Sequence, residues 1–134
     1  MSNCDPAANI VVRLDPDERF LDFDFYKIAC GSPIVSQCGF REYCTGRKAT
    51  DFLEMDYSAV IRDLNVTDEE QQFVVFLEWD ALRCAIAKYL GAAVPGADGD
   101  RCQIIAIKHE DNKIEISEVI LPPKNLPSVN IDKQ

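Results

Sequence analysis

Residues 30–36 read Cys-Gly-Ser-Pro-Ile-Val-Ser and directly follow a strand-like segment. Ser32 is a favourable N-cap residue, and Pro33 suits the first turn of a helix because its missing N–H group is not needed there. The stretch therefore predicts a change from strand to helix, with the helix running from Ser32 to about Cys44. The same reading places Cys30 at the helix N-terminus, where unpaired N–H groups and a partial positive charge favour a thiolate.

Two strand-like segments come before this stretch. Residues 9–14 form an apolar run, and residues 15–19 are rich in turn-forming residues. From residue 20 to residue 28 the sequence alternates with a period of two. One side is expected to carry Phe20, Asp22, Asp24 and Tyr26, and the other Leu21, Phe23, Phe25 and Lys27. Together the two segments predict an antiparallel hairpin.

Three helices are expected after residue 46. Two are short, over residues 50–55 and 57–64. The third is long and runs from residue 68 to residue 90, because Thr67 and Glu70 have the spacing of a capping box. Residues 73–77 are apolar throughout, which is typical of a central buried helix, with a strand as the alternative.

The remaining chain predicts a second hairpin. Gly91 ends the long helix and opens a connector to residue 100. Residues 102–108 and 113–121 are strand-like and are separated by polar turn residues. We therefore expect an α+β fold, a small antiparallel sheet with helices packed on one face, plus this C-terminal hairpin. Residues 1–91 are expected to form the main domain, residues 92–121 its hairpin extension, and residues 122–134 a flexible tail.

Composition excludes several classes of protein. The formal net charge of -9 argues against nucleic-acid binding, which relies on Lys and Arg. No apolar run is long enough for a membrane span, and the first residues lack the charged and apolar regions of a signal peptide. We expect a cytoplasmic protein. Its six cysteines are then more typical of metal binding, reactivity or burial than of disulfides.

Residues 4–90 resemble the IscU/NifU family of iron–sulfur cluster assembly scaffolds, in the SufE/NifU superfamily. Residues 30–36 are similar to the family's Cys-Gly-Ser-Ala-Ile-Ala-Ser, and Cys4 lies 26 positions before Cys30, where the family places its first cluster cysteine. The likeness continues at a set of helix residues: Glu42, Gly46, Leu53, Asp80, Ala81, Leu82, Ala85, Ala87 and Tyr89.

The resemblance implies a metal site with an incomplete set of ligands. In the family, three cysteines and a nearby aspartate or histidine hold a transient 2Fe–2S cluster or a zinc ion. Cys30 and Cys4 match two of the cysteines, and Asp5 stands one place before the usual aspartate position. The third cysteine should lie at the start of the long helix, where this chain has Phe73 and Val74. Neither side chain can bind a metal.

Three functions follow from this incomplete set. The first is a scaffold-like protein that binds an iron–sulfur cluster or another metal through Cys30 and Cys4, shared across a homodimer. The second is a SufE-like persulfide acceptor with Cys30 as the nucleophile, fed by a cysteine desulfurase. The third is a non-metal-binding paralogue that binds or regulates another protein of the assembly machinery.

The other cysteines have weaker functional cases. Cys38 and Cys44 do not share a face of the expected helix, and packing roles are favoured for both. Cys84 lies on the apolar long helix and is expected in the core, while Cys102 opens the added hairpin. The sequence shows no Ser/His/Asp arrangement, phosphate loop or catalytic histidine, so we expect no enzymatic turnover.

Overall fold

Two β-hairpins build one antiparallel sheet in the computed structural model of the protein, which describes residues 7–27, 33–92 and 101–121. The first hairpin consists of β1 (Ala8–Leu14) and β2 (Phe20–Lys27). The second consists of β3 (Cys102–His109) and β4 (Ile114–Ile120). Because β1 also pairs with β4, the strand order is β2-β1-β4-β3 and both hairpins belong to one sheet.

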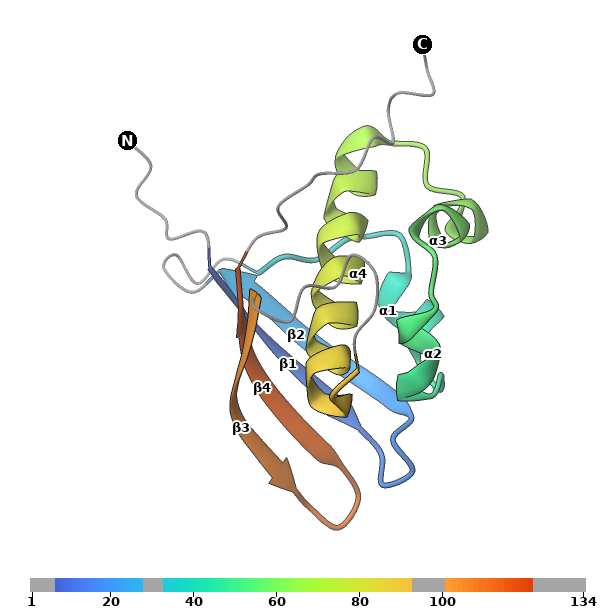
Figure 1. The fold of residues 1–134 in the computed structure, drawn as a ribbon. Helices are drawn as coiled ribbons and strands as arrows, with labels where there is room; N and C mark the ends of the chain where they lie inside the picture. The colour runs from blue at the N-terminus through green and yellow to red at the C-terminus, as the bar shows by residue number, and fades with distance from the viewer. Residues whose placement is uncertain (1–6, 28–32, 93–100, 122–134) are drawn as a thin grey trace, which may run out of the picture.

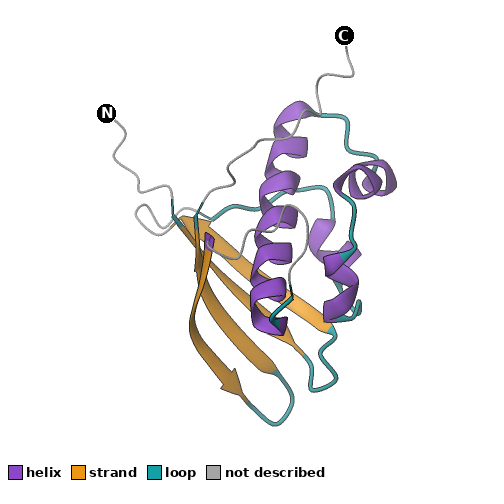
Figure 2. Ribbon diagram, in the orientation of Figure 1, coloured by secondary structure: helices purple, strands orange, loops and turns teal. Residues whose placement is uncertain are grey.

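Four helices lie between the hairpins in sequence and cover one face of the sheet (Figures 1 and 2). They are α1 (Phe40–Cys44), α2 (Ala49–Leu53), α3 (Tyr57–Leu64) and α4 (Glu69–Leu90). α4 packs against β1, β3 and β4, whereas α1 packs against β2. The predicted α+β class, with helices on one face and a C-terminal hairpin, is confirmed. Within the described ranges, no helix has both the length and the apolar composition to cross a membrane.

Period-two patterns decide which side chains of the sheet face the helices. Every second residue of β1, from Ala8 to Leu14, is buried, and the same alternation runs through β4 from Ile114 to Ile120. Leu82 and Ile86 of α4 are also fully buried in the same hydrophobic core. Burying such branched side chains stabilises the fold by about 1.5–3 kcal/mol each.

The predicted alternation of β2 is wrong at Phe20. Phe20 was expected on the side of Asp22, yet it is fully buried together with Phe23 and Phe25. The register with β1 shifts between Arg13 and Leu14, a bulge that leaves one residue of β2 unpaired. The extra residue turns Phe20 into the core and leaves Leu21 exposed.

The helix expected from Ser32 is also wrong: α1 begins only at Phe40, and residues 33–39 are extended or bent. The cause is a set of bonds made by this segment to distant residues. The backbone N–H of Ile34 donates to the carbonyl of Phe25 at 2.9 Å. The next two bonds go to side chains of α4, from Ser36 N–H to Glu78 at 3.2 Å and from Gln37 N–H to Gln71 at 2.8 Å. These tertiary partners outcompete the local capping signal.

The other helices lie close to their expected positions. α2 begins one residue earlier than expected, and α3 matches the expected range. The cap of α4 is Asp68 rather than Thr67, since the Asp68 side chain accepts from Gln71 N–H at 2.9 Å. Gly91 ends α4 in the left-handed conformation, at φ 71°, as glycine does at helix C-termini.

Burial along α4 is greatest in its second half. Residues 80–87 are all buried, whereas Phe73 is 40% exposed and Val74 and Leu77 are half-buried. The apolar run at residues 73–77 therefore forms a helix as predicted but is not its most buried part. The buried part includes two charged residues and a cysteine, Asp80, Arg83 and Cys84.

Candidate functional site

The three predicted ligands, Cys30, Cys4 and Asp5, lie outside the described residues. The described chain resumes at residue 7 after Cys4 and Asp5, and it ends at Lys27 before Cys30. Ala8 of β1 lies opposite Lys27 of β2 in the register of the first hairpin. The chain segments leading to Cys4 and to Cys30 thus begin from adjacent positions at the same end of the sheet.

One row of residues crosses the whole sheet at this end (Figure 1). Cys102 pairs with Ile120, Ile120 pairs with Ala8, and Ala8 pairs with Lys27. The first residue of β3 therefore lies at the same end of the sheet as the start of β1 and the end of β2. Sequence reasoning could not place Cys102 there, because the pairing of β4 with β1 joins segments about a hundred residues apart.

Glu78 holds the segment that follows Cys30. This carboxylate is 2% exposed and accepts the Ser36 hydroxyl at 2.6 Å in addition to the Ser36 N–H. Burial raises the pKa of Glu78, and the two bonds from Ser36 oppose that rise. Gln71, two turns earlier on α4, accepts from the thiol of Cys38 at 3.4 Å. Residues 34–38 therefore lie against α4, and the side chains of Glu78 and Gln71 hold them there.

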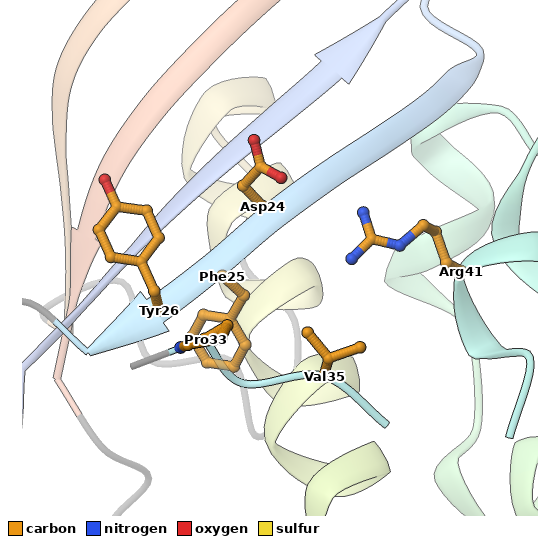
Figure 3. Close-up of a pocket in the computed structure, with 6 residues that line it drawn as sticks. All are labelled: Asp24, Phe25, Tyr26, Pro33, Val35 and Arg41. Atoms are coloured by element: carbon orange, nitrogen blue, oxygen red, sulfur yellow. The ribbon is translucent and has the colours of Figure 1, made fainter. Parts of the chain in front are cut away.

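A cavity of about 450 Å³ lies beside the edge strand β2. In Figure 3, Pro33 and Val35 project from the segment below β2, and Arg41 points from α1 toward the strand. The cavity is lined by Asp24, Phe25, Tyr26, Pro33, Val35 and Arg41. The Arg41 guanidinium donates to the carbonyl of Phe23 and lies 4.5 Å from the centre of its ring. The cavity is thus lined by residues of β2, which precede Cys30 in the sequence, and by residues of the segment and helix that follow it.

The expected position of the third cysteine lies near the start of α4. Phe73 and Val74 occupy it, less than one turn beyond Gln71, whose side chain contacts residues 37 and 38. In residues 7–27, 33–92 and 101–121, no three His, Cys, Asp or Glu side chains are grouped so that they could hold a metal ion.

Cys44 and Cys38 differ in their surroundings. Cys44 is fully buried in the core, as its expected packing role requires, and burial raises the pKa of its thiol strongly. Cys38 is half-buried, and burial is also the main reason for its raised pKa. Neither thiol is favoured as a thiolate at neutral pH.

A second group of polar side chains is buried between α4 and the C-terminal hairpin. Arg101 forms an ion pair with Asp80, in which Nη1 lies 3.2 Å from Oδ1 and Nη2 donates to Oδ2. The same guanidinium donates to the carbonyl of Leu121 and, through Nη1, to Cys84 Sγ at 3.3 Å. Arg101 therefore links α4 to the end of β4 through hydrogen bonds.

Cys84 and Cys102 complete this group. The two thiols share a hydrogen bond, which lowers the pKa of Cys84, and the charge of Arg101 lowers it further against the effect of burial. The pKa of Cys102 is raised because its proton is held by Cys84 and because it is buried. Cys84 is 1% exposed and Cys102 4%, so the expectation that Cys84 lies in the core is confirmed.

Glu118 lies beside the two thiols. It is fully buried, and neither of its carboxyl oxygens has a hydrogen-bond partner among the described residues. Burial raises its pKa to about 8, the charge of Cys84 adds to this rise, and Lys88 opposes it. A buried carboxyl without a partner is unusual and is typical of functional sites.

Sequence reasoning missed this group, although one signal was present. Glu118 occupies an inward position in the alternation of Ile114, Ile116 and Ile120, where a carboxylate conflicts with the pattern. Asp80 and Cys84 are four residues apart and share a face of α4. The pairing of these two elements with Arg101 and Cys102 is a result of tertiary structure.

Comparisons of the chain with protein-family models, with curated proteins and with solved structures found no match.

Proposed function

We propose that this protein binds an iron–sulfur cluster or a metal ion such as zinc as cargo, through Cys30 and Cys4 and with Asp5 as a further ligand. The observation that carries the proposal is the pairing of Ala8 with Lys27. Cys4 lies four residues before Ala8, and Cys30 lies three residues after Lys27. Since an extended residue spans about 3.3–3.6 Å, segments of four and three residues have a backbone reach of at most roughly 14 Å and 11 Å.

The chemistry of the donor set supports soft or borderline metals. Thiolates are the preferred ligands of zinc and of iron–sulfur clusters, which usually take four protein ligands. Two cysteines and one carboxylate from a single chain leave the set incomplete. Sharing between two copies of the chain around a two-fold axis would supply four thiolates, so a homodimer is part of the proposal.

One argument for the SufE-like alternative, in which a persulfide forms on Cys30, does not hold in the structure. It relied on the thiolate-stabilising N-terminus of a helix beginning at Ser32, and the described helix begins at Phe40 instead. No specific contact among the residues that the structure describes favours the alternative of a partner-binding paralogue. We further propose that the protein is cytoplasmic and without enzymatic turnover, and that assembly proteins are its partners. The four described cysteines are free thiols, as in a reducing compartment.

Metal and sulfide analysis of anaerobically purified protein tests this proposal. We expect iron with sulfide, or zinc, in wild-type protein and its loss in Cys30→Ser and in Cys4→Ser. Cys38→Ser is the matched control, because this half-buried cysteine is not among the proposed ligands, and it should retain the metal. A metal-free wild type after reconstitution with iron and sulfide, or with zinc, would overturn the proposal.

Incubation with a cysteine desulfurase and cysteine separates the alternatives. A mass increase of one sulfur atom at Cys30, without bound metal, would favour the persulfide acceptor and contradict the cluster-binding role. Absence of metal and of persulfide in the folded protein would overturn both and leave the partner-binding paralogue.

A further inference from the structure

Cys84 and Cys102 form a buried pair of thiols in direct contact. They come from the second half of α4 and the first position of β3, elements that pack against each other. Their hydrogen bond brings the sulfur atoms close together, beside the Arg101 guanidinium, whose Nη1 lies 3.3 Å from Cys84 Sγ. A pair of thiols in this relation is the arrangement from which a disulfide can form.

Arg101 gives the two thiols different reactivities. Its Nη1 donates to Cys84 Sγ at 3.3 Å, while the bonds to Asp80 and to the Leu121 carbonyl fix the position of the guanidinium. A cationic donor at the sulfur favours the thiolate, which is the form that reacts with oxidants. Cys84 is therefore the nucleophile of the pair, and Cys102 remains protonated.

Glu118 supplies a group that can take up the proton of Cys102. The two residues lie at inward positions of neighbouring strands, since Cys102 pairs with Ile120 and Glu118 lies two residues before it. They are close enough for the charge of Glu118 to raise the pKa of Cys102. The Glu118 carboxyl oxygens have no partner in the described part of the chain, so above about pH 8, where Glu118 is ionised, the carboxylate can accept a proton.

We propose that Cys84 and Cys102 are a redox site at which hydrogen peroxide converts the two thiols into a disulfide, with Arg101 stabilising the Cys84 thiolate and the ionised form of Glu118 accepting the Cys102 proton. This site shares no residue with the proposed metal site and does not depend on it. The disulfide would tie α4 to β3 and so couple the C-terminal hairpin covalently to the helical layer.

The reaction balances in two steps. In the first, the Cys84 thiolate attacks one oxygen of hydrogen peroxide: an S–O bond forms, the O–O bond breaks and hydroxide leaves, so that sulfur is oxidised to sulfenic acid and peroxide is reduced. In the second, Cys102 transfers its proton to Glu118, and its sulfur attacks Cys84. The S–S bond forms as the S–O bond breaks, and the leaving hydroxide takes the proton from Glu118 to form water. In total, two thiols and one peroxide give one disulfide and two waters.

The test uses the full chain with Cys4, Cys30 and Cys38 changed to Ser and Cys44 changed to Ala. After treatment with hydrogen peroxide, this variant should lose the mass of two hydrogen atoms. Proteolysis should then release a linked pair of peptides containing residues 84 and 102, and a dithiol reductant should reverse the change. The same linked peptides are expected from oxidised wild-type protein, which serves as the second measurement if the multiple variant does not fold.

Two further variants test the separate roles. With Cys102→Ser, the reaction should stop at a Cys84 sulfenic acid, which a cyclic 1,3-dione traps as an adduct. With Glu118→Gln above about pH 8, where wild-type Glu118 is ionised, sulfenic acid should accumulate, because removal of a general base slows a proton transfer by about a hundredfold or more. Disulfide formation at an unchanged rate in Glu118→Gln would overturn the role of Glu118.

The redox site itself is contradicted by three results. These are thiols that stay unmodified in folded protein, oxidation only to sulfinic or sulfonic acid, and linkage only between chains. Each would mean that Cys84 and Cys102 are packing residues. Because the multiple variant lacks Cys4 and Cys30, its outcome is independent of any metal or persulfide result.

Discussion

Ser36 donates both its hydroxyl and its backbone N–H to Glu78, at 2.6 and 3.2 Å, across a separation of 42 residues. These two bonds hold the chain after Cys30 against the middle of α4. They also give hydrogen-bond partners to the Glu78 carboxylate, which is buried. The relationship explains why a segment with favourable helix-start residues is extended instead. Charge-assisted hydrogen bonds of this kind stabilise by about 1.5–3 kcal/mol each, more than a local N-cap does.

Replacement of Glu78 should therefore destabilise the protein. For Glu78→Ala we expect a decrease of about 2–3 kcal/mol in the free energy of unfolding, because the Ser36 donors lose their acceptor. Glu78→Gln retains one acceptor oxygen and should lose less. Urea unfolding followed by circular dichroism measures the change. Glu70→Ala, at an exposed position of the same helix, is the control and should stay within about 0.5 kcal/mol of wild type.

Glu118 should make stability depend on pH. Its pKa is raised from 4.5 to about 8 in the folded protein, so between these values the folded state binds a proton that the unfolded state does not. Stability from this group is then present at acidic pH, is lost as the pH rises toward 8, and levels off above it. The groups that face the carboxyl are Cys84 and Lys88 from α4 and Cys102 from β3.

Unfolding measured between pH 5 and pH 8 tests this dependence, with a loss on the order of 2–4 kcal/mol expected in wild type. Glu118→Gln cannot ionise and should remove most of the slope. An equal slope in both proteins would show that another group is responsible.

The buried ion pair of Asp80 and Arg101 should show strong coupling. Asp80→Ala leaves the guanidinium without its carboxylate, and Arg101→Met leaves a buried carboxylate alone, so each should lower stability by about 3–5 kcal/mol. The double variant removes both charges and should be less destabilised than the sum of the single variants, by about 2 kcal/mol. Denaturant unfolding of the four proteins measures the coupling, and additive effects would contradict it.

Cys44 and Cys38 should respond differently to the same substitution. Cys44→Ser places a hydroxyl in the fully buried core and should lower stability by roughly 1–3 kcal/mol. Cys38→Ser changes a half-buried residue whose hydrogen bond to Gln71 a hydroxyl can replace, so we expect a change below about 1 kcal/mol. Thermal unfolding under reducing conditions compares the two variants, and a larger loss in Cys38→Ser would reverse the assignment of the core cysteine.

Much of the fold could be predicted from local patterns. The apolar run of residues 9–14 and the strand-like residues 113–121 located β1 and β4, and Gly91 marked the end of α4 because a left-handed residue terminates a helix there. The candidate site could be predicted only in part, since the pairing of Ala8 with Lys27 follows from the hairpin, whereas the position of Cys102 does not. The bulge that turns Phe20 inward likewise breaks a strict period of two.

The sequence by itself determined the two hairpins, the order of the helices and the burial of Cys44 and Cys84, because periodicity and caps act between residues only a few positions apart. Only the tertiary structure decided that residues 33–39 are extended or bent instead of helical and that Cys84, Cys102, Arg101 and Glu118 meet. In both cases the deciding contacts join residues 17 to 42 positions apart. Such hydrogen bonds form only once α4 packs on the sheet, and buried charges then require partners that no local pattern specifies.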